Sequence, residues 1–399
     1  MSTWTNAQRF VELALALELH MPGYVDSYFG PEEIREKVKA KGSIPLEELS
    51  AQAADLLQTT REDESLSRDR RTYLLAELTA MQTTLRILRG ETLDFQAESR
   101  GLYGLSPAWT DEIVFIEAHQ ALDDLYPGTG TLAERRASFL EKTIIPSDTL
   151  IAIIRTLAME FQERTKGVFN LPENESCDFF AVNDAPWTAY NWYLGGYRSR
   201  IDINTDLPIY AGYVPHLVAH EAYAGHHTEH AIKEQVLFHE RGLLEHSILL
   251  VNTPSCVACE GIAENALDVL VTDEELVHIF RHVLREAGIG EVSAEQLVRI
   301  RKVGRPLNRV GVNRALMLHA HSASEEDVVD YGVRYALMTE ERSRKSLAFL
   351  TDPLWRSYVS LYALGYELVS HYLGEGEDCV ERFQTLLQEP VTTSQLMAL

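Results

Sequence analysis

Apolar residues recur at helical spacing along most of the chain. In residues 6–19 they cover one wide helical face, and the pattern stops at Met21-Pro22-Gly23. Comparable patterns, bounded by proline and acidic residues or by glycine, predict helices at residues 31 onward, 45–61, 67–89, 109–122, 132–142, 148–164, 273–287, 293–301, 307–319, 324–338, 340–350 and 355–373. The chain is therefore predicted to be mainly α.

The segment from about residue 166 to residue 210 departs from this pattern. It is rich in aromatic and β-branched residues and in glycine, proline, asparagine and aspartate. Within it, TAYNWYL and YRSRIDIN alternate partly between apolar and polar residues and are separated by Gly195-Gly196, which predicts a β-hairpin. We expect one large helical domain over residues 1–399, with a helical front half at 1–170 and the hairpin and candidate site at 171–399.

Composition narrows the range of partners. The chain has 60 acidic and 36 basic residues, a formal charge of -24, and this argues against nucleic acids and anionic membranes, which bind basic surfaces. No apolar stretch approaches about 18 to 20 residues, and the opening MSTWTNAQRF lacks the basic region of a signal peptide. Four scattered cysteines do not form a disulfide framework, so we expect a reducing, cytoplasmic location.

The densest candidate chemistry lies at residues 216–234, HLVAHEAYAGHHTEHAIKE, which hold five histidines and three glutamates. Imidazole and carboxylate are the ligands that catalytic zinc prefers, and a glutamate beside the metal is the usual base for water. His220 and Glu221 open such a motif. The alternative interpretation is a polar helix face that binds nothing, and the histidines expected at the surface or at helix ends are His216, His230 and His239.

The second imidazole is ambiguous, because position i+4 from His220 is Ala224. On a regular helix His227 lies about 20° from the face of His220, and His226 about 120° from it. His227, however, is also about 10 Å along the axis, a long span for two imidazoles that share an ion with bonds near 2 Å. A bulge at Ala224-Gly225 would absorb the extra residues and place His226 where an i+4 histidine normally stands.

A second motif supplies a carboxylate. Cys259-Glu260-Gly261-Ile262-Ala263-Glu264 opens a run, IAENALDVLV, with the pattern of a helix, and two-helix zinc sites take their third ligand from such a place. Glu260 is the candidate. The lone Cys256-Val-Ala-Cys259 lacks the second cysteine pair of a zinc ribbon, and core thiols are its simpler interpretation.

These two motifs resemble a known family. Residues 220–227 look like the HE-x-x-P-G-H-H signature, and Glu260-Gly261-Ile262-Ala263 looks like the E-G-W-A signature, of the bacterial family named domain of unknown function 885, with Ala224 and Ile262 in place of the proline and the tryptophan. The resemblance implies a mostly helical zinc peptidase, similar to carboxypeptidase Taq and angiotensin-converting enzyme. It implies His226 as the second ligand and keeps His227 as the alternate. Tyr362-Ala363-Leu364-Gly365 resembles a late Y-x-x-G element of the same family.

The expected activity is hydrolysis of a peptide or small amide by water on one Zn²⁺ per chain. His220, His226 and Glu260 are the expected metal ligands, Glu221 is the general base, and Tyr362 is a donor to the oxyanion. The candidate substrate-binding residues are Tyr223, Arg305 and Arg309. Two alternatives stay open at this point: a metal-binding helical scaffold without catalysis, and an amidase that acts on a small non-peptide molecule.

Overall fold

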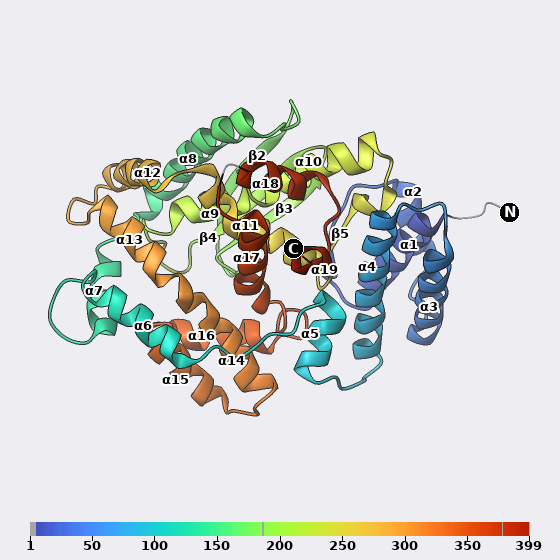
Figure 1. Ribbon diagram of the computed structural model, residues 1–399, viewed down its shortest axis with the longest axis horizontal. Coiled ribbons are helices and arrows are strands. Elements are labelled where there is room, and N and C mark those ends of the chain that lie inside the picture. The colour runs from blue at the N-terminus through green and yellow to red at the C-terminus, as the bar shows by residue number, and fades with distance from the viewer. Residues whose placement is uncertain (1–4, 186, 377, 399) are drawn as a thin grey trace.

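The structure is a computed structural model that describes residues 5–185, 187–376 and 378–398. The mainly α fold class is confirmed. Figure 1 shows the N-terminal helices packed at one end of the molecule, and the C-terminal helices α17 to α19 near its middle. Within the described residues, no helix combines the length and the apolar character that a membrane crossing requires.

The first elements form a helical layer with a core of its own. They are α1 (Asn6–Glu18), β1 (Val25–Tyr28), α2 (Glu32–Lys41), α3 (Leu46–Glu62) and α4 (Arg68–Leu88). Their boundaries follow the predicted ones within a few residues, because capping residues stand where the helices begin: Thr5 accepts a hydrogen bond from the backbone of Gln8, and Ser67 accepts one from Arg70. Ile248 and Leu250, from far along the chain, complete this core.

The next helices lead to the sheet. They are α5 (Phe95–Tyr103), α6 (Glu112–Asp123), α7 (Leu132–Glu141) and α8 (Ser147–Val168). The sequence did not predict α5, which Asp94 caps through a hydrogen bond to the backbone of Ala97. The largest core cluster begins at α6 and α8 and continues into the C-terminal half.

The predicted hairpin is present. Strands β3 (Ala189–Gly195) and β4 (Arg198–Asn204) pair antiparallel around the Gly195-Gly196 turn. A third strand, β2 (Ser176–Val182), was not predicted as a partner, and it pairs parallel with β4 to give the order β2-β4-β3. The outer strand β3 lies beside β1, where the Ser27 hydroxyl donates to the Tyr193 carbonyl at 2.6 Å. β1 itself pairs antiparallel with β5 (Ile248–Leu250).

The remaining elements carry the candidate site and its supports. They are α9 (Val214–Glu221), α10 (His226–Lys233), the π-helical η1 (Glu234–Glu240), the 3-10 helix η2 (Leu244–Ser247), α11 (Pro254–Leu270), α12 (Asp273–Glu286), α13 (Ala294–Gly304), the 3-10 helix η3 (Arg305–Asn308), α14 (Arg309–His319), α15 (Glu325–Tyr335), α16 (Glu340–Thr351), α17 (Ser360–Leu373), α18 (Cys379–Gln388) and α19 (Thr393–Met397). The sequence did not predict α18 and α19.

One helix boundary near the site differs from the prediction. Residues 355–373 were predicted as one helix, but α17 begins only at Ser360, after turns that contain Trp355 and Tyr358. Asp352 holds these turns, because its carboxylate accepts hydrogen bonds from the backbone of Leu354 and Trp355. The turns place Tyr358 beside Tyr362, with ring centroids 6.0 Å apart.

Candidate metal centre

The histidine-rich stretch forms two helices rather than one. α9 ends at Glu221 and α10 begins at His226. Across the junction the Gly225 amide donates to the Ala219 carbonyl at 2.9 Å, and the Thr228 amide donates to the Ala222 carbonyl at 3.2 Å. Each of these bonds spans six residues instead of four, so two residues are absorbed and His226 takes the place of an i+4 histidine.

Gly225 makes the junction possible. A Cβ atom at this position would overlap the backbone oxygens of Ala219 and His220. These are backbone atoms that cannot rotate away, so any side chain here would push α9 and α10 apart. The bulge predicted at Ala224-Gly225 is therefore present, and glycine is required at its second residue.

Three predicted ligands come together. One nitrogen or carboxylate oxygen from each of His220, His226 and Glu260 lies within 4.8 Å of the others. His220 Nε2 is 3.6 Å from Glu260 Oε2, and His226 Nε2 is 3.9 Å from Glu260 Oε1. The two imidazole planes are nearly perpendicular, with centroids 4.7 Å apart. Two imidazoles and one carboxylate are a ligand set typical of catalytic zinc.

Burial leaves this group with unused hydrogen-bonding capacity. His226 Nδ1 and Glu260 Oε2 are buried and have no hydrogen-bond partner among the described residues. Burial lowers the pKa of His220 well below its usual value and that of His226 to about 4, and it raises the pKa of Glu260. The imidazoles are thus held neutral, which is the form that binds a metal. The group fits a divalent cation in its donor chemistry and its unpaired atoms.

Glu260 meets α17 because two glycines face each other where the helices cross. A Cβ atom on Gly261 of α11 would lie 2.5 Å from the Gly365 carbonyl oxygen of α17, and one on Gly365 would lie 2.8 Å from the Val257 carbonyl oxygen. The close crossing brings the Tyr358 hydroxyl to 2.7 Å from Glu260 Oε1, to which it donates. It also places Tyr362 in the wall of the same cavity.

Glu221, the predicted base, lines this cavity at the end of α9. Its carbonyl oxygen accepts a hydrogen bond from the Asn191 side chain of β3 at 2.6 Å, which ties the helix end to the sheet. Burial first, and then the charges of Glu264 and Asp26, raise the pKa of Glu221 to about 8. A carboxyl group that lines a cavity and has a pKa shifted toward neutral pH is typical of a general base.

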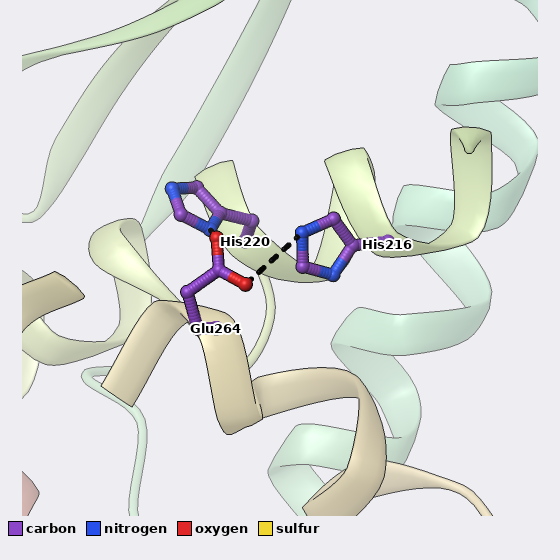
Figure 2. A group of neighbouring side chains, drawn as sticks. All are labelled: His216, His220 and Glu264. Carbon is purple, nitrogen blue, oxygen red and sulfur yellow. Dashed lines mark ion pairs between the residues drawn. The ribbon is translucent and has the colours of Figure 1, made fainter. Parts of the chain in front are cut away.

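A second group shares His220 with the first. Figure 2 shows Glu264 of α11 reaching toward His216 and His220, both of α9. Its two oxygens lie 3.7 Å from His216 Nε2 and 3.6 Å from His220 Nδ1. His220 therefore has Glu264 on one ring nitrogen and Glu260 on the other. A carboxylate on the far nitrogen of a ligating histidine commonly fixes the ring, and Glu264 is placed for that role.

The histidines expected at the surface differ from one another. His230 is buried, because α10 packs against α11, α18 and β3, and it stacks on His226 with centroids 5.9 Å apart. The expectation of a surface residue was therefore wrong for His230. His239 is half-exposed and contacts Glu234 at 3.1 Å.

His227, the alternate ligand, faces away from the group. It is fully buried, with Nδ1 2.8 Å from the Ser199 hydroxyl and Nε2 2.9 Å from Glu175. Tyr223 belongs to the same network and donates to Glu175 at 2.8 Å. Neither His227 nor Tyr223 is among the described residues that line the cavity.

The two candidate arginines also lie outside the cavity lining. The Arg305 guanidinium contacts Asp268 and the Tyr366 hydroxyl, and Arg309 contacts Glu367. Two hydrogen bonds to Glu367 occupy the Arg309 guanidinium, and one to Asp268 with one to the Tyr366 hydroxyl occupy that of Arg305. The arginines of this basic segment thus pair with acidic side chains, of which the chain has a surplus. This is a simpler interpretation than a role in substrate binding.

The cavity has walls that the sequence did not indicate. It encloses about 1220 Å³ free of protein atoms, part of it open to solvent, and it reaches from the metal group to α4, β1, β3 and β5. Asp26, Tyr190 and Asn191 form its wall beside Glu221. No motif marks Asp26, which lies about 200 residues from the metal ligands. The sequence did offer a signal for Tyr358, because this residue precedes Tyr362 by four positions and so falls on the same predicted helix face.

Comparisons with known proteins show the fold only. No family model matches this chain, and no curated protein matches it in sequence. A solved structure described as a "putative lipoprotein" from Colwellia psychrerythraea is 15% identical, with a TM-score of 0.58, over 92% of this chain and 72% of that one. A second, described as a "putative lipoprotein of unknown function" from Shewanella oneidensis, is 14% identical, with a TM-score of 0.53, over 99% and 82%.

Proposed function

We propose that this chain is a zinc-dependent hydrolase of peptide bonds. The observation that carries the proposal is the convergence of two neutral imidazoles and a carboxylate at one end of a cavity whose wall also holds Glu221. His220, His226 and Glu260 would hold the metal. When bound, zinc supplies a Lewis acid that polarises a carbonyl group and lowers the pKa of water.

The protein's own groups divide the remaining work. Glu221, in its ionised form, accepts the proton of the attacking water and passes it on to the leaving amine. The Tyr362 hydroxyl donates to the oxyanion, and burial, with the nearby carboxylates, keeps that phenol protonated. Tyr358 holds Glu260 in place by its hydrogen bond and leaves the donor role to Tyr362.

An edge strand supports a peptide as the substrate. β3 is an outer strand of the three-stranded sheet; β1 lies beside it at Tyr193, and its residues Ala189, Tyr190 and Asn191 line the cavity. An extended peptide that adds to such an edge gains backbone hydrogen bonds without a requirement for particular side chains. A small non-peptide amide would not use this edge, so the edge favours the peptide alternative.

The experiment combines metal analysis with one substitution. Zinc-loaded protein is expected to carry one zinc per chain and to cleave members of a mixed peptide library. Glu221→Gln keeps the shape of the side chain but loses the base, so it should bind zinc normally and lose about 100-fold or more in rate. Glu117→Gln, on an exposed residue of α6, is the matched control and should change neither property.

Two results would contradict the proposal. Zinc bound at the site without cleavage of any peptide would favour the metal-binding scaffold. Loss of zinc in Glu221→Gln would make that glutamate a ligand, and the base would have to be sought elsewhere.

A further inference from the structure

The cavity is strongly acidic. Six carboxyl groups line it, and Lys233 is the single lysine or arginine among its described lining residues; the acids are Asp26, Glu77, Glu221, Glu229, Glu234 and Glu260. The lining histidines do not offset this charge, because burial lowers the pKa of His230 and of His246 to about 3 each. Burial also raises the pKa of Glu77 to about 7 and that of Glu221 to about 8, so these two carboxyl groups do not carry full charge at neutral pH, whereas Asp26, with a pKa raised to about 6, stays mostly ionised.

Lys233 is not placed to receive a substrate carboxylate. Its ammonium group lies 2.5 Å from Glu229 Oε1, within the same helix turn, and its side chain is mostly buried. Arg305 and Arg309 are paired outside the cavity. A free C-terminal carboxylate would therefore find no unpaired lysine or arginine among the described residues that line the cavity.

Buried atoms without partners also point to a donor-rich ligand. Asn191 is 7% exposed, and its Oδ1 has no hydrogen-bond partner among the described residues. Its amide nitrogen is fixed on the Glu221 carbonyl, so Oδ1 cannot be exchanged for the donor end of the side chain. Glu229 is fully buried and presents an unpartnered Oε2. Both residues line the cavity, and each unpartnered atom is an acceptor that needs an N–H or O–H group.

Asp26 contributes a carboxyl group to the same cavity. It lies on β1, accepts a hydrogen bond from the Tyr190 hydroxyl, and lines the cavity. Tyr190 is the chain neighbour of Asn191, and the charge of Asp26 makes the smallest of the three contributions that raise the pKa of Glu221. Asp26, Asn191 and Glu221 all line the same cavity.

We propose that the substrate carries a cationic nitrogen, a primary ammonium or guanidinium group, and that its N–H groups donate to Asp26 and to Asn191 Oδ1 beside Glu221. This inference rests on the proposed function and adds a substrate class to it. An ammonium group brings three donors and a positive charge, which match a carboxylate and an unpaired amide oxygen. Asp26 and Asn191 are then substrate-binding residues contributed by β1 and β3.

The test uses the zinc-loaded full chain and one peptide sequence in four forms: free amino terminus, N-acetylated, N-acetylated with one lysine, and the last with norleucine in place of lysine. We expect kcat/KM to be about tenfold or more higher for each cationic form than for its neutral counterpart, the range of a charged hydrogen bond. Preference for the free amino terminus alone identifies the α-ammonium as the ligand, and preference for lysine alone identifies a basic side chain. Equal rates for all four forms would overturn the inference while leaving the hydrolase intact.

Substitutions then locate the site. Asp26→Asn keeps the hydrogen bond from Tyr190 but removes the charge, so the ratio of cationic to neutral kcat/KM should fall about tenfold. Asp178→Asn, on an exposed aspartate of β2, is the matched control and should keep the ratio. A ratio unchanged in Asp26→Asn would overturn the assignment. The ratio is independent of a general loss of folded enzyme.

Binding separates this inference from the proposed function. Calorimetry with trialanine and with N-acetyl-trialanine does not require cleavage. Tighter binding of the free amine that weakens in Asp26→Asn would support the cation site even if no peptide were hydrolysed. The N-acetylated lysine and norleucine peptides are compared in the same way, and equal binding within both pairs, or tighter binding of the neutral member of both pairs, would overturn it.

Discussion

His226 and His227 are adjacent in the chain but belong to two different buried polar regions. His227, Ser199, Glu175 and Tyr223 form a network in which each side chain has a hydrogen-bond partner. His226 belongs to a group in which buried polar atoms have no partner among the described residues. One region is complete without a ligand, and the other is not.

This difference teaches how to tell a structural histidine from a functional one. A buried polar atom without a partner costs about 1 to 3 kcal/mol, and native proteins leave few of them. Such atoms in the His226 group are explained if a metal completes the group. The Ser199–His227–Glu175 arrangement resembles a hydrolytic triad in residue types, but Ser199 is 3% exposed and His227 fully buried, so no substrate reaches it.

The largest effect is expected at His226. His226→Ala removes one of three ligands, and zinc affinity should fall by more than the roughly 10- to 100-fold that the loss of a ligand's hydrogen-bond partner costs. Peptide cleavage should disappear with the metal. Equilibrium zinc titration of the folded variant is the measurement. Retention of zinc at wild-type affinity would mean that His226 is not a metal ligand.

Gly225→Ala tests how the two regions are kept apart. The added Cβ overlaps backbone oxygens of α9, so the junction must shift and His226 must move from His220. We expect weaker zinc binding together with a lower unfolding free energy. Gly167→Ala is the control, since Gly167 lies in α8 with open space around its Cβ position. That change should stabilise the protein by about 0.5 to 1 kcal/mol.

These same residues show which parts of the fold and the site could be predicted from the sequence. Most helices were predicted within a few residues, as was the hairpin, because their signals are local, whereas α5 was missed despite its Asp94 cap. His220, Glu221 and Glu260 could be chosen from the types and spacing of ligands, and His226 required the assumption of a bulge. Glycine at position 225 hinted at that bulge.

The rest of the site depends on contacts between distant segments. The sequence could not show that Gly261 meets Gly365, the crossing that brings Tyr358 onto Glu260. It also could not show that β1 lies beside β3, which brings Asp26 into the cavity. The parallel pairing of β2 with β4 likewise joins segments whose order in the sheet no local pattern encodes.

His227→Ala should show the opposite profile to His226→Ala. It leaves the Ser199 hydroxyl and one Glu175 oxygen without their imidazole partner in the interior. We expect the unfolding free energy to fall by about 3 kcal/mol, from unpaired polar groups and a cavity, while zinc affinity stays near the wild-type value. Denaturant unfolding and zinc titration of the same preparation measure both. Loss of zinc without loss of stability would reverse the assignment.

The smallest effect concerns His246, which tests whether an unpartnered nitrogen alone marks a metal ligand. His246 Nε2 is buried without a partner, and its ring lies against Tyr73 with centroids 4.6 Å apart, yet it belongs to neither ligand group. Burial lowers its pKa to about 3, with the charges of Lys233 and Arg70 acting in the same direction. Below about pH 6.5 the unfolded chain therefore binds a proton at this residue that the folded protein does not, and stability is lost as the pH falls from 6.5 toward 3.

His246→Phe keeps the ring but removes the titration, so the drop in unfolding free energy of the metal-free protein between pH 7 and pH 4.5 should shrink by about 2 kcal/mol. His278→Phe, on an exposed residue of α12, should leave that drop unchanged. Zinc binding should be normal in both variants, and weaker binding in His246→Phe would show that the metal site extends beyond the three predicted ligands.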